Sequence, residues 1–173
     1  MYYDSDARMK GAAEMPLPFN PFKALVAPRP IGWVSTLTED GLVNLAPYSY
    51  FQAVADSPDI VMFSATPELQ VAAAQGVKFG DERKDSQSNA AVSGEFVCNI
   101  VSHELAGLMN ETSAHLPADR SEAEHAGITM VASQNVRTPR VAACPAAIEC
   151  VFLESRPGPR RGGDHIYHMV FGE

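Results

Sequence analysis

The sequence predicts a mainly β protein of antiparallel strands, arranged as a barrel or a sandwich with a few helices between the strands. Three observations favour this fold class. About six or seven short runs rich in β-branched and aromatic residues are separated by turn residues. The first three runs follow one another without the helices that a parallel sheet requires. Asp40-Gly41, between the first two runs, is a strong hairpin signal.

The predicted strands are short apolar runs, each bounded by turn residues. In chain order they are Ile31–Leu37, Leu42–Phe51, Ile60–Ala65, Glu95–Val101, Ala146–Glu154 and His165–Phe171. Pro47 lies inside the second of these strands. Because proline has no N–H to donate to a ladder, we expect that strand to break, to bulge or to run along a sheet edge near Pro47.

Helices and loops fill the intervals between the strands. Helices are expected at Lys84–Ser93, Glu104–Thr112 and Ser121–Ala126. The first of them is expected to stop at Gly94, because glycine readily ends a helix. Pro21–Val26 forms either one helical turn or a short strand. A loop with a short helix is expected at Pro67–Asp81, and a loop rich in Gly, Pro and Arg at Pro157–Gly163.

Length and charge limit the classes of function. At 173 residues the chain is expected to form one domain, residues 21–173, preceded by an N-terminal extension over residues 1–20. The 13 basic and 21 acidic residues leave a formal net charge of −8. This balance disfavours nucleic acid as the main partner, because phosphate backbones require a basic surface.

The cysteines and the hydropathy pattern indicate the compartment. Cys98, Cys144 and Cys150 have neither the spacing of a disulfide scaffold nor that of a zinc site, so we expect free thiols and no metal. The sequence contains no apolar run of the roughly 18 residues that a membrane helix needs. It also shows no signal-peptide pattern at its start. These features predict a cytoplasmic protein that does not enter a membrane.

The first of three candidate binding segments ends the first predicted strand. Ser35 and Thr36 are hydroxyl residues that can donate to a phosphate, and Trp33, two residues earlier, could cover a flat ring. The alternative is that the two hydroxyls open the following turn and that Trp33 packs in the core.

The second segment runs from Val43 to Phe51 around Pro47. A strand interrupted by proline exposes backbone N–H and C=O groups, which suit the hydrogen-bonding edge of a flavin ring without adding charge. The alternative is an ordinary edge strand whose aromatic side chains fill the core.

The third segment, Glu82–Asn89, places cations, hydroxyls and an amide just before a helix. Phosphate groups are bound by such a combination of a lysine charge and hydroxyl donors. We expect Lys84 and Ser86 to contribute more than the helix dipole. The alternative is an ordinary helix start with Asp85 or Ser86 as N-cap and with solvated cations.

These segments occur in one order with further motifs. The series is Pro28-Arg29-Pro30-Ile31, Val34-Ser35-Thr36, Asp40-Gly41, Asn44-Leu45-Ala46-Pro47-Tyr48-Ser49, Lys84-Asp85-Ser86 with Asn89, Gly94-Glu95-Phe96-Val97, Asn99-Ile100, Pro139-Arg140-Val141 and Ala147-Ile148-Glu149-Cys150. With this order and spacing, the region from Pro21 to Glu173 resembles the flavin reductase-like family of FMN-binding split barrels.

The resemblance implies an antiparallel six-stranded split β-barrel with peripheral helices, assembled as a homodimer with FMN in a groove at or near the subunit interface. It also assigns cofactor-binding roles. Trp33, Val34, Ser35 and Thr36 would line the ribityl chain and the ring, Asn44, Ala46, Pro47, Tyr48 and Ser49 would meet the ring edge, and Lys84, Ser86 and Asn89 would take the phosphate. Members of the family continue beyond the Gly-Glu that matches Gly172-Glu173, so we expect a last strand that is cut short.

The function that the resemblance implies is an oxidoreductase that transfers hydride from NAD(P)H to flavin or to a flavin-linked acceptor. A small-molecule redox substrate or a partner monooxygenase would then take the electrons. The hydride chemistry belongs to the flavin, so no catalytic side chain is assigned, and none of the five histidines is given that role. Two alternatives remain open: an FMN-binding electron carrier or flavin store that does not use pyridine nucleotides, and a non-redox barrel that binds haem or another ligand or serves as an interaction domain.

Overall fold

The structure, a computed structural model, describes residues 21–65, 84–117, 119–159 and 167–173. The predicted N-terminal extension over residues 1–20, the loop at 67–81 and most of the loop at 157–163 therefore lie outside the described residues. In the described part, no helix has the length and apolar character needed to cross a membrane.

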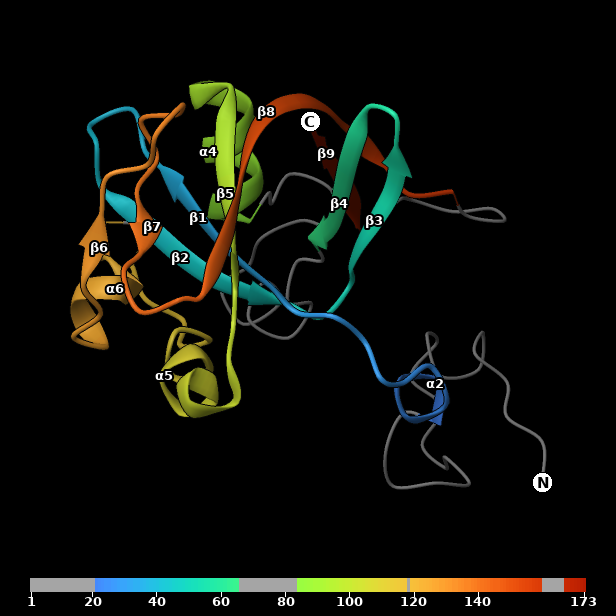
Figure 1. The fold of residues 1–173 in the computed structure, drawn as a ribbon, viewed down its shortest axis with the longest axis horizontal. Helices are drawn as coiled ribbons and strands as arrows, with labels where there is room; N and C mark the ends of the chain where they lie inside the picture. The colour runs from blue at the N-terminus through green and yellow to red at the C-terminus, as the bar shows by residue number, and fades with distance from the viewer. Residues whose placement is uncertain (1–20, 66–83, 118, 160–166) are drawn as a thin grey trace, which may run out of the picture.

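Seven strands form one curled antiparallel sheet in the order β2-β1-β5-β8-β9-β4-β3. They are β1 (Gly32–Leu37), β2 (Val43–Tyr48), β3 (Phe51–Asp56), β4 (Asp59–Ala65), β5 (Glu95–Ile100), β8 (Ala146–Pro157) and β9 (His168–Gly172). In Figure 1, β8 arches from the group of β1, β2 and β5 to the group of β9, β4 and β3. The predicted antiparallel split-barrel architecture is confirmed, although the sheet has seven strands where six were expected.

The edge strand β2 accommodates Pro47 without loss of a ladder bond. Ser35 pairs with Leu45, and Trp33 pairs with Pro47. The Leu45 N–H donates to a carboxylate oxygen of Glu122 and not to β1, so these are the non-hydrogen-bonded pairs of the ladder. The side of Pro47 that lacks an N–H therefore faces away from β1. This confirms the predicted edge position of Pro47.

The predicted strand Leu42–Phe51 is divided shortly after Pro47, where a break was one of the expected outcomes, because the chain changes there from one edge of the sheet to the other. The change occurs at Ser49 and Tyr50, after Pro47, and β3 then pairs with β4. The carbonyl of Tyr50 accepts a bond from the Ser64 N–H at 2.8 Å, which begins the new pairing. Most of β3 is exposed and lacks apolar alternation, so its sequence does not indicate a strand.

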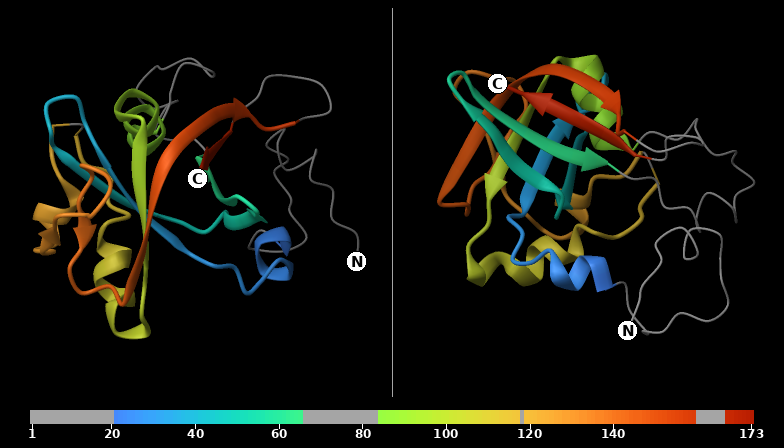
Figure 2. Two further views of the ribbon diagram at one scale, coloured as in Figure 1. Left: turned by 45° about the horizontal axis from the view of Figure 1, so that its top comes forward. Right: turned by 90° about the vertical axis from the view of Figure 1, so that its right-hand side faces the viewer.

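The helical segments confirm the three predicted helices. The observed helical segments are α2 (Pro21–Leu25), α4 (Asp85–Ser93), the single 3₁₀ turn η1 (His103–Leu105), α5 (Ala106–Glu111) and α6 (Glu122–His125). Of the two outcomes expected for Pro21–Val26, the structure shows the helical turn, over Pro21–Leu25. Figure 2 shows α4 and α5 at opposite ends of β5, which the chain order α4–β5–α5 requires.

Helix α4 begins and ends with different kinds of cap. At its end Gly94 adopts a left-handed conformation with φ of 76°, and its N–H donates to the Ala90 carbonyl at 3.0 Å. At its start the N-cap residue is Lys84, which makes no side-chain capping bond. The alternative in which Asp85 or Ser86 caps the helix is therefore wrong. Both residues lie inside the first turn, where Ser86 is buried against β2.

The core consists of two clusters on the two faces of β1. The barrel cluster, enclosed by the curled sheet and α4, is Val34, Phe51, Val61, Phe63, Ala65, Ala90, Phe96, Cys98, Cys150 and Val170. The flank cluster, on the other face, is Trp33, Leu45, Ala123, Val141 and Cys144. Because successive residues of a strand face opposite sides, neighbouring β1 residues enter different clusters. All three cysteines are free and buried, as expected.

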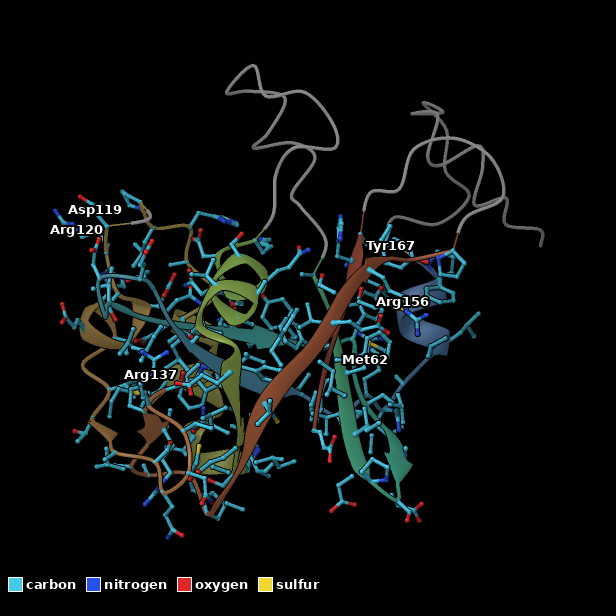
Figure 3. The ribbon with its side chains drawn as sticks, turned by 90° about the horizontal axis from the view of Figure 1, so that it is seen from above. Met62, Asp119, Arg120, Arg137, Arg156 and Tyr167 are labelled. Atoms are coloured by element: carbon cyan, nitrogen blue, oxygen red, sulfur yellow. The ribbon has the colours of Figure 1, made fainter. Side chains whose placement is uncertain are left out.

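The flank cluster is covered by α5, α6 and a short hairpin of β6 (Met130–Val131) and β7 (Arg140–Val141). These elements, α4 and strands β2, β1 and β5 form the covered half of the molecule. Strands β9, β4 and β3 with the end of β8 form the open half. Figure 3 shows Arg137 on the covered half and Arg156 on the open half. Two-residue strands such as β6 and β7 leave no periodicity to detect in a sequence, so this hairpin was not predicted.

Candidate functional site

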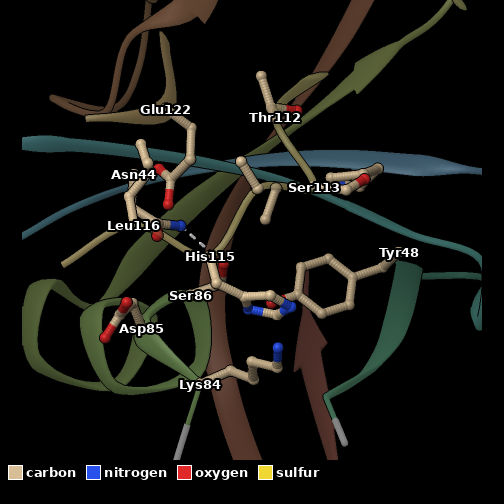
Figure 4. Close-up of a pocket in the computed structure, with 13 residues that line it drawn as sticks. Asn44, Tyr48, Lys84, Asp85, Ser86, Thr112, Ser113, His115, Leu116 and Glu122 are labelled. Carbon is tan, nitrogen blue, oxygen red and sulfur yellow. Dashed lines mark hydrogen bonds between the residues drawn. The ribbon is translucent and has the colours of Figure 1, made fainter. Parts of the chain in front are cut away.

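A pocket of about 310 Å³ opens beside the edge strand β2. Its walls come from β2, the start of α4, the segment after α5, and α6 (Figure 4). The lining residues are Asn44, Ala46, Pro47, Tyr48, Lys84, Asp85, Ser86, Thr112, Ser113, Ala114, His115, Leu116 and Glu122. The volume lies at the lower end of the roughly 300–1,000 Å³ that is usual for small-molecule sites.

Six of the predicted cofactor residues line this pocket: Asn44, Ala46, Pro47, Tyr48, Lys84 and Ser86. They come from the second and third candidate segments, which lie about forty residues apart in the sequence. Asn89 lines a smaller neighbouring pocket of about 90 Å³, which shares Asn44 and Asp85 with the larger one. Ser49, in the second segment, is half-buried and is not among the lining residues of either pocket.

The four predicted residues of β1 are buried behind the site. Val34 belongs to the barrel cluster and Trp33 to the flank cluster. The Ser35 hydroxyl donates to the Pro139 carbonyl at 2.7 Å. Thr36 accepts a bond from the Asn89 amide at 3.3 Å. These four side chains pack or form hydrogen bonds inside the protein, and none of them lines either pocket.

Trp33 nevertheless affects the pocket through its indole N–H. This group donates to the Thr112 hydroxyl at 2.8 Å, and the same hydroxyl donates to the Met109 carbonyl at 2.7 Å. Thr112 is the first residue of the segment 112–116 that forms one wall of the pocket. A fully buried side chain on β1 therefore fixes the start of a wall that comes from nearly eighty residues later in the chain.

The start of α4 and strand β2 are joined by polar contacts. The Asn44 amide donates to the Ser86 hydroxyl at 2.8 Å, and both side chains are buried. Tyr48 also forms a side-chain hydrogen bond with Ser86. Burial of the Tyr48 phenol raises its pKa to about 12, although the bond to Ser86 acts in the opposite direction. Tyr48 is therefore neutral at physiological pH and can donate a hydrogen bond.

Glu122 brings a buried carboxyl group into the pocket, which the sequence reasoning missed. The residue is 7% exposed, and its Oε2 accepts a bond from the Leu45 N–H at 3.1 Å. Burial raises the pKa of the carboxyl above its ordinary value, and the nearby charge of Asp85 adds to this increase. The bond from the Leu45 N–H lowers the pKa and so offsets part of the effect.

The segment 112–116 was also missed. It follows α5 without a glycine-rich loop, a metal-ligand spacing or another motif that suggests a binding site. His115 was considered among the five histidines, but no feature of the sequence separates it from the others. Only the position of Thr112 against Trp33 brings this segment to the pocket.

Comparison with known proteins identifies relatives over most of the chain. A family model described as "Flavin reductase like domain" matches residues 25–171. An uncharacterised protein of Aquifex aeolicus is 35% identical over 151 residues, which are 86% of this chain and 68% of the relative. The chain spans between 51% and 68% of the lengths of five curated relatives that it matches.

Solved structures resemble the fold closely. Nitrilotriacetate monooxygenase component B from Bacillus cereus has a TM-score of 0.75 and 30% identity, over 92% of this chain and 79% of its own. A Shewanella frigidimarina protein described as a flavin reductase with a split barrel domain has a TM-score of 0.75 at 17% identity, over 99% and 76% of the two chains. The second likeness supports the split-barrel fold alone. Because the family model spans all but the ends of the sequence, the chain belongs to the flavin reductase-like domain family.

Proposed function

We propose that the chain binds FMN in the pocket beside β2 and acts as an NAD(P)H-dependent flavin oxidoreductase. The observation that carries this proposal is the convergence of Lys84 and Ser86 with strand β2 on one pocket, in a chain of the flavin reductase-like family. Bound FMN would supply reversible two-electron redox chemistry, and the protein would hold and orient it.

The donor groups of the pocket fit a flavin that carries one phosphate. Lys84 contributes a positive charge, and the Ser86 hydroxyl and the neutral Tyr48 phenol are hydrogen-bond donors near it. Lys84 is the one lysine or arginine among the described lining residues, and its charge suits a phosphomonoester. The carboxyl groups of Glu122 and Asp85 disfavour an anion on their side of the pocket, so we assign the phosphate to the Lys84 side.

The residues of this chain have three roles in the proposal. Lys84 and Ser86 bind the phosphate, and Ala46, Pro47 and Tyr48 form the wall against the ring. The buried β1 residues support the site from behind, because Trp33 positions Thr112 and Thr36 holds Asn89. Strand β2 contributes backbone polar groups that can bind the ligand without adding charge.

The test is a titration of the purified protein with FMN and with riboflavin, followed by flavin fluorescence and absorbance. Riboflavin is the matched ligand because it lacks only the phosphate. We expect a shifted flavin spectrum with FMN and weaker binding of riboflavin. Equal affinity for both ligands would contradict the phosphate assignment, and no binding of either would contradict the whole proposal.

Anaerobic mixing of the FMN-loaded protein with NADH, and separately with NADPH, tests the electron donor. We expect one of the two to bleach the flavin absorbance within the turnover time. If neither does so while dithionite still reduces the bound flavin, the chain is an FMN-binding electron carrier and not a reductase. The sequence has no GxGxxG fingerprint, so the reductant would be held by stacking and shape.

We also propose a homodimer and a partner monooxygenase. Exposed apolar side chains such as Val54 and Leu153 on the open half are suitable for contact with a second subunit. The likeness to component B of nitrilotriacetate monooxygenase supports a partner that consumes reduced flavin. Sedimentation velocity across a range of protein concentrations tests the homodimer, and a single monomeric species at all of them would exclude it.

A further inference from the structure

The outward edge of β2 around Pro47, a lining residue of the pocket, turns acceptors rather than donors away from β1. Leu45 and Pro47 belong to the non-hydrogen-bonded pairs of the β1–β2 ladder, so their backbone groups point away from β1. The Leu45 N–H is already bonded to Glu122, and Pro47 has no N–H. The carbonyl groups of both residues point the same way. This stretch of backbone therefore presents oxygen atoms and no free N–H.

Glu122 adds a second set of acceptor atoms to the same wall. Helix α6 holds it there, with Ser121 as the N-cap whose hydroxyl accepts a bond from the Glu124 N–H at 3.4 Å. One carboxylate oxygen of Glu122 is engaged by Leu45, and the residue lines the pocket. In Figure 4 the Glu122 carboxyl and the Lys84 ammonium lie toward opposite sides of the pocket. The pocket thus combines an acceptor-rich wall with a cationic one.

We propose that Glu122 accepts a hydrogen bond from an N–H group of the bound ligand and thereby sets the orientation of that ligand in the pocket. This inference rests on the proposed function, since the ligand considered is FMN. The oxidised isoalloxazine ring has one N–H, at N3 between the carbonyl oxygens O2 and O4, so on that edge only N3–H can donate to an acceptor of this wall. With N3–H at Glu122, the phosphate is left to the opposite, Lys84 side.

The competing role for Glu122 is purely structural, as a partner for the otherwise unpaired N–H of Leu45. A glutamine at position 122 separates the two roles. Its carbonyl oxygen can still accept from the Leu45 N–H, but the amide then turns its NH₂ group toward the ligand. A donor facing the N3–H removes the proposed bond while it retains the structural one.

The experiment compares FMN with its N3-methyl analogue in wild type, Glu122→Gln and Glu124→Gln. Glu124 is the matched control, because it is an exposed residue of the same helix. We expect wild type and Glu124→Gln to bind FMN about tenfold to a hundredfold more tightly than the analogue, which is the usual effect of a hydrogen bond to a charged group. In Glu122→Gln the two affinities should become nearly equal.

An unchanged preference for FMN in a folded Glu122→Gln variant would overturn the assignment and leave the proposed function standing. Failure of wild type to bind FMN would overturn both. If Glu122→Gln does not fold, FMN that is isotopically labelled at N3 gives the answer in wild type. A bound N3–H protected from solvent exchange supports the assignment, and exchange as fast as in free FMN overturns it.

Discussion

The covered and the open half of the sheet differ in how their strands are buried. In the covered half the first five residues of β1 are buried, because the strand has a cluster on each face. In the open half only Phe51 of β3 is buried, and the five residues after it are exposed. A strand enclosed on both faces must satisfy its polar groups internally, whereas an exposed strand leaves them to water. The pocket lies in the half where polar groups are held by protein partners.

Asn99 shows how the covered half satisfies its polar groups. This fully buried residue of β5 donates to the Trp33 carbonyl at 2.9 Å and to the Ser35 hydroxyl at 3.2 Å. Its carbonyl oxygen accepts from the Val141 N–H at 2.7 Å. One side chain thus joins β1, β5 and the β6–β7 hairpin. In the open half, by contrast, the Gln52 amide bonds only to the neighbouring Ala53 carbonyl, at an exposed position.

The largest expected effect is that of Asn99→Ala, which breaks this network. The substitution leaves the Val141 N–H buried without its partner and removes the side-chain bond to the Trp33 carbonyl, so we expect the free energy of unfolding to fall by about 3 kcal/mol. Urea denaturation followed by circular dichroism measures it. Gln52→Ala removes the same amide from the open half and should cost less than about 0.5 kcal/mol. Equal losses of unfolding free energy in Asn99→Ala and Gln52→Ala would contradict the proposed difference in how the two halves satisfy their polar groups.

Gly172→Ala tests whether the inner face of the open half is as tightly packed as the covered half. A methyl group on Gly172 would lie 2.4 Å from the Phe96 ring and 3.0 Å from the Cys150 Cβ. We expect overpacking to cost about 2 kcal/mol of unfolding free energy. Gly107→Ala on α5, with no atom within 4 Å of the added methyl, serves as the control and should not destabilise. If Gly172→Ala leaves the free energy of unfolding unchanged, the side chains on this face can rearrange to accept the added methyl group.

Lys84→Ala separates binding from stability at the edge of the covered half. Loss of a charge-assisted contact to phosphate should weaken FMN binding by roughly 1–3 kcal/mol. The affinity for riboflavin, which has no phosphate, should remain unchanged. Lys23→Ala in α2 is the matched control, because Lys23 is exposed and is not among the lining residues of the pocket. Unchanged FMN affinity in Lys84→Ala would show that the phosphate does not bind at Lys84.

The pH dependence of stability reports on Glu122. A carboxyl whose folded pKa is raised above its ordinary value of 4.5 binds more protons in the folded state. Its contribution is therefore fully present below that value and is lost as the pH rises through the raised pKa. Relative to Glu122→Gln, wild type should become less stable between acidic and neutral pH. The free energy of unfolding is measured by urea denaturation at several pH values. If it changes with pH in the same way in both proteins, the pKa of Glu122 is not raised in the folded state.

The smallest expected effect is at Val54, in the open half. This residue is 46% exposed and lies at the irregularity in the β3–β4 register. In the isolated chain Val54→Ser should change the free energy of unfolding by less than about 0.5 kcal/mol. A larger loss that depends on protein concentration would show that the proposed homodimer buries this part of the surface.

The parts of the fold that could be predicted are those that short-range chemistry decides. Strands β1, β4 and β5, the hairpin at Asp40-Gly41 and the stop of α4 at Gly94 follow from local residue types. Strand β3 and the β6–β7 hairpin could not be predicted, because exposure and shortness remove the apolar alternation that marks a strand. The site follows the same division. Lys84, Ser86 and the β2 residues stood out, whereas Glu122 and the 112–116 segment did not.

By itself the sequence determined the antiparallel class, an irregular or edge position for the strand at Pro47, and two segments of the pocket, because each depends on the backbone chemistry of a few neighbouring residues. Only the tertiary structure decided that Trp33 supports the pocket from within the flank cluster. It also brought the Glu122 carboxyl against the β2 edge. These contacts join residues nearly eighty positions apart. Such pairings arise from the packing of whole elements against one another, so they cannot be predicted from the local sequence around each residue.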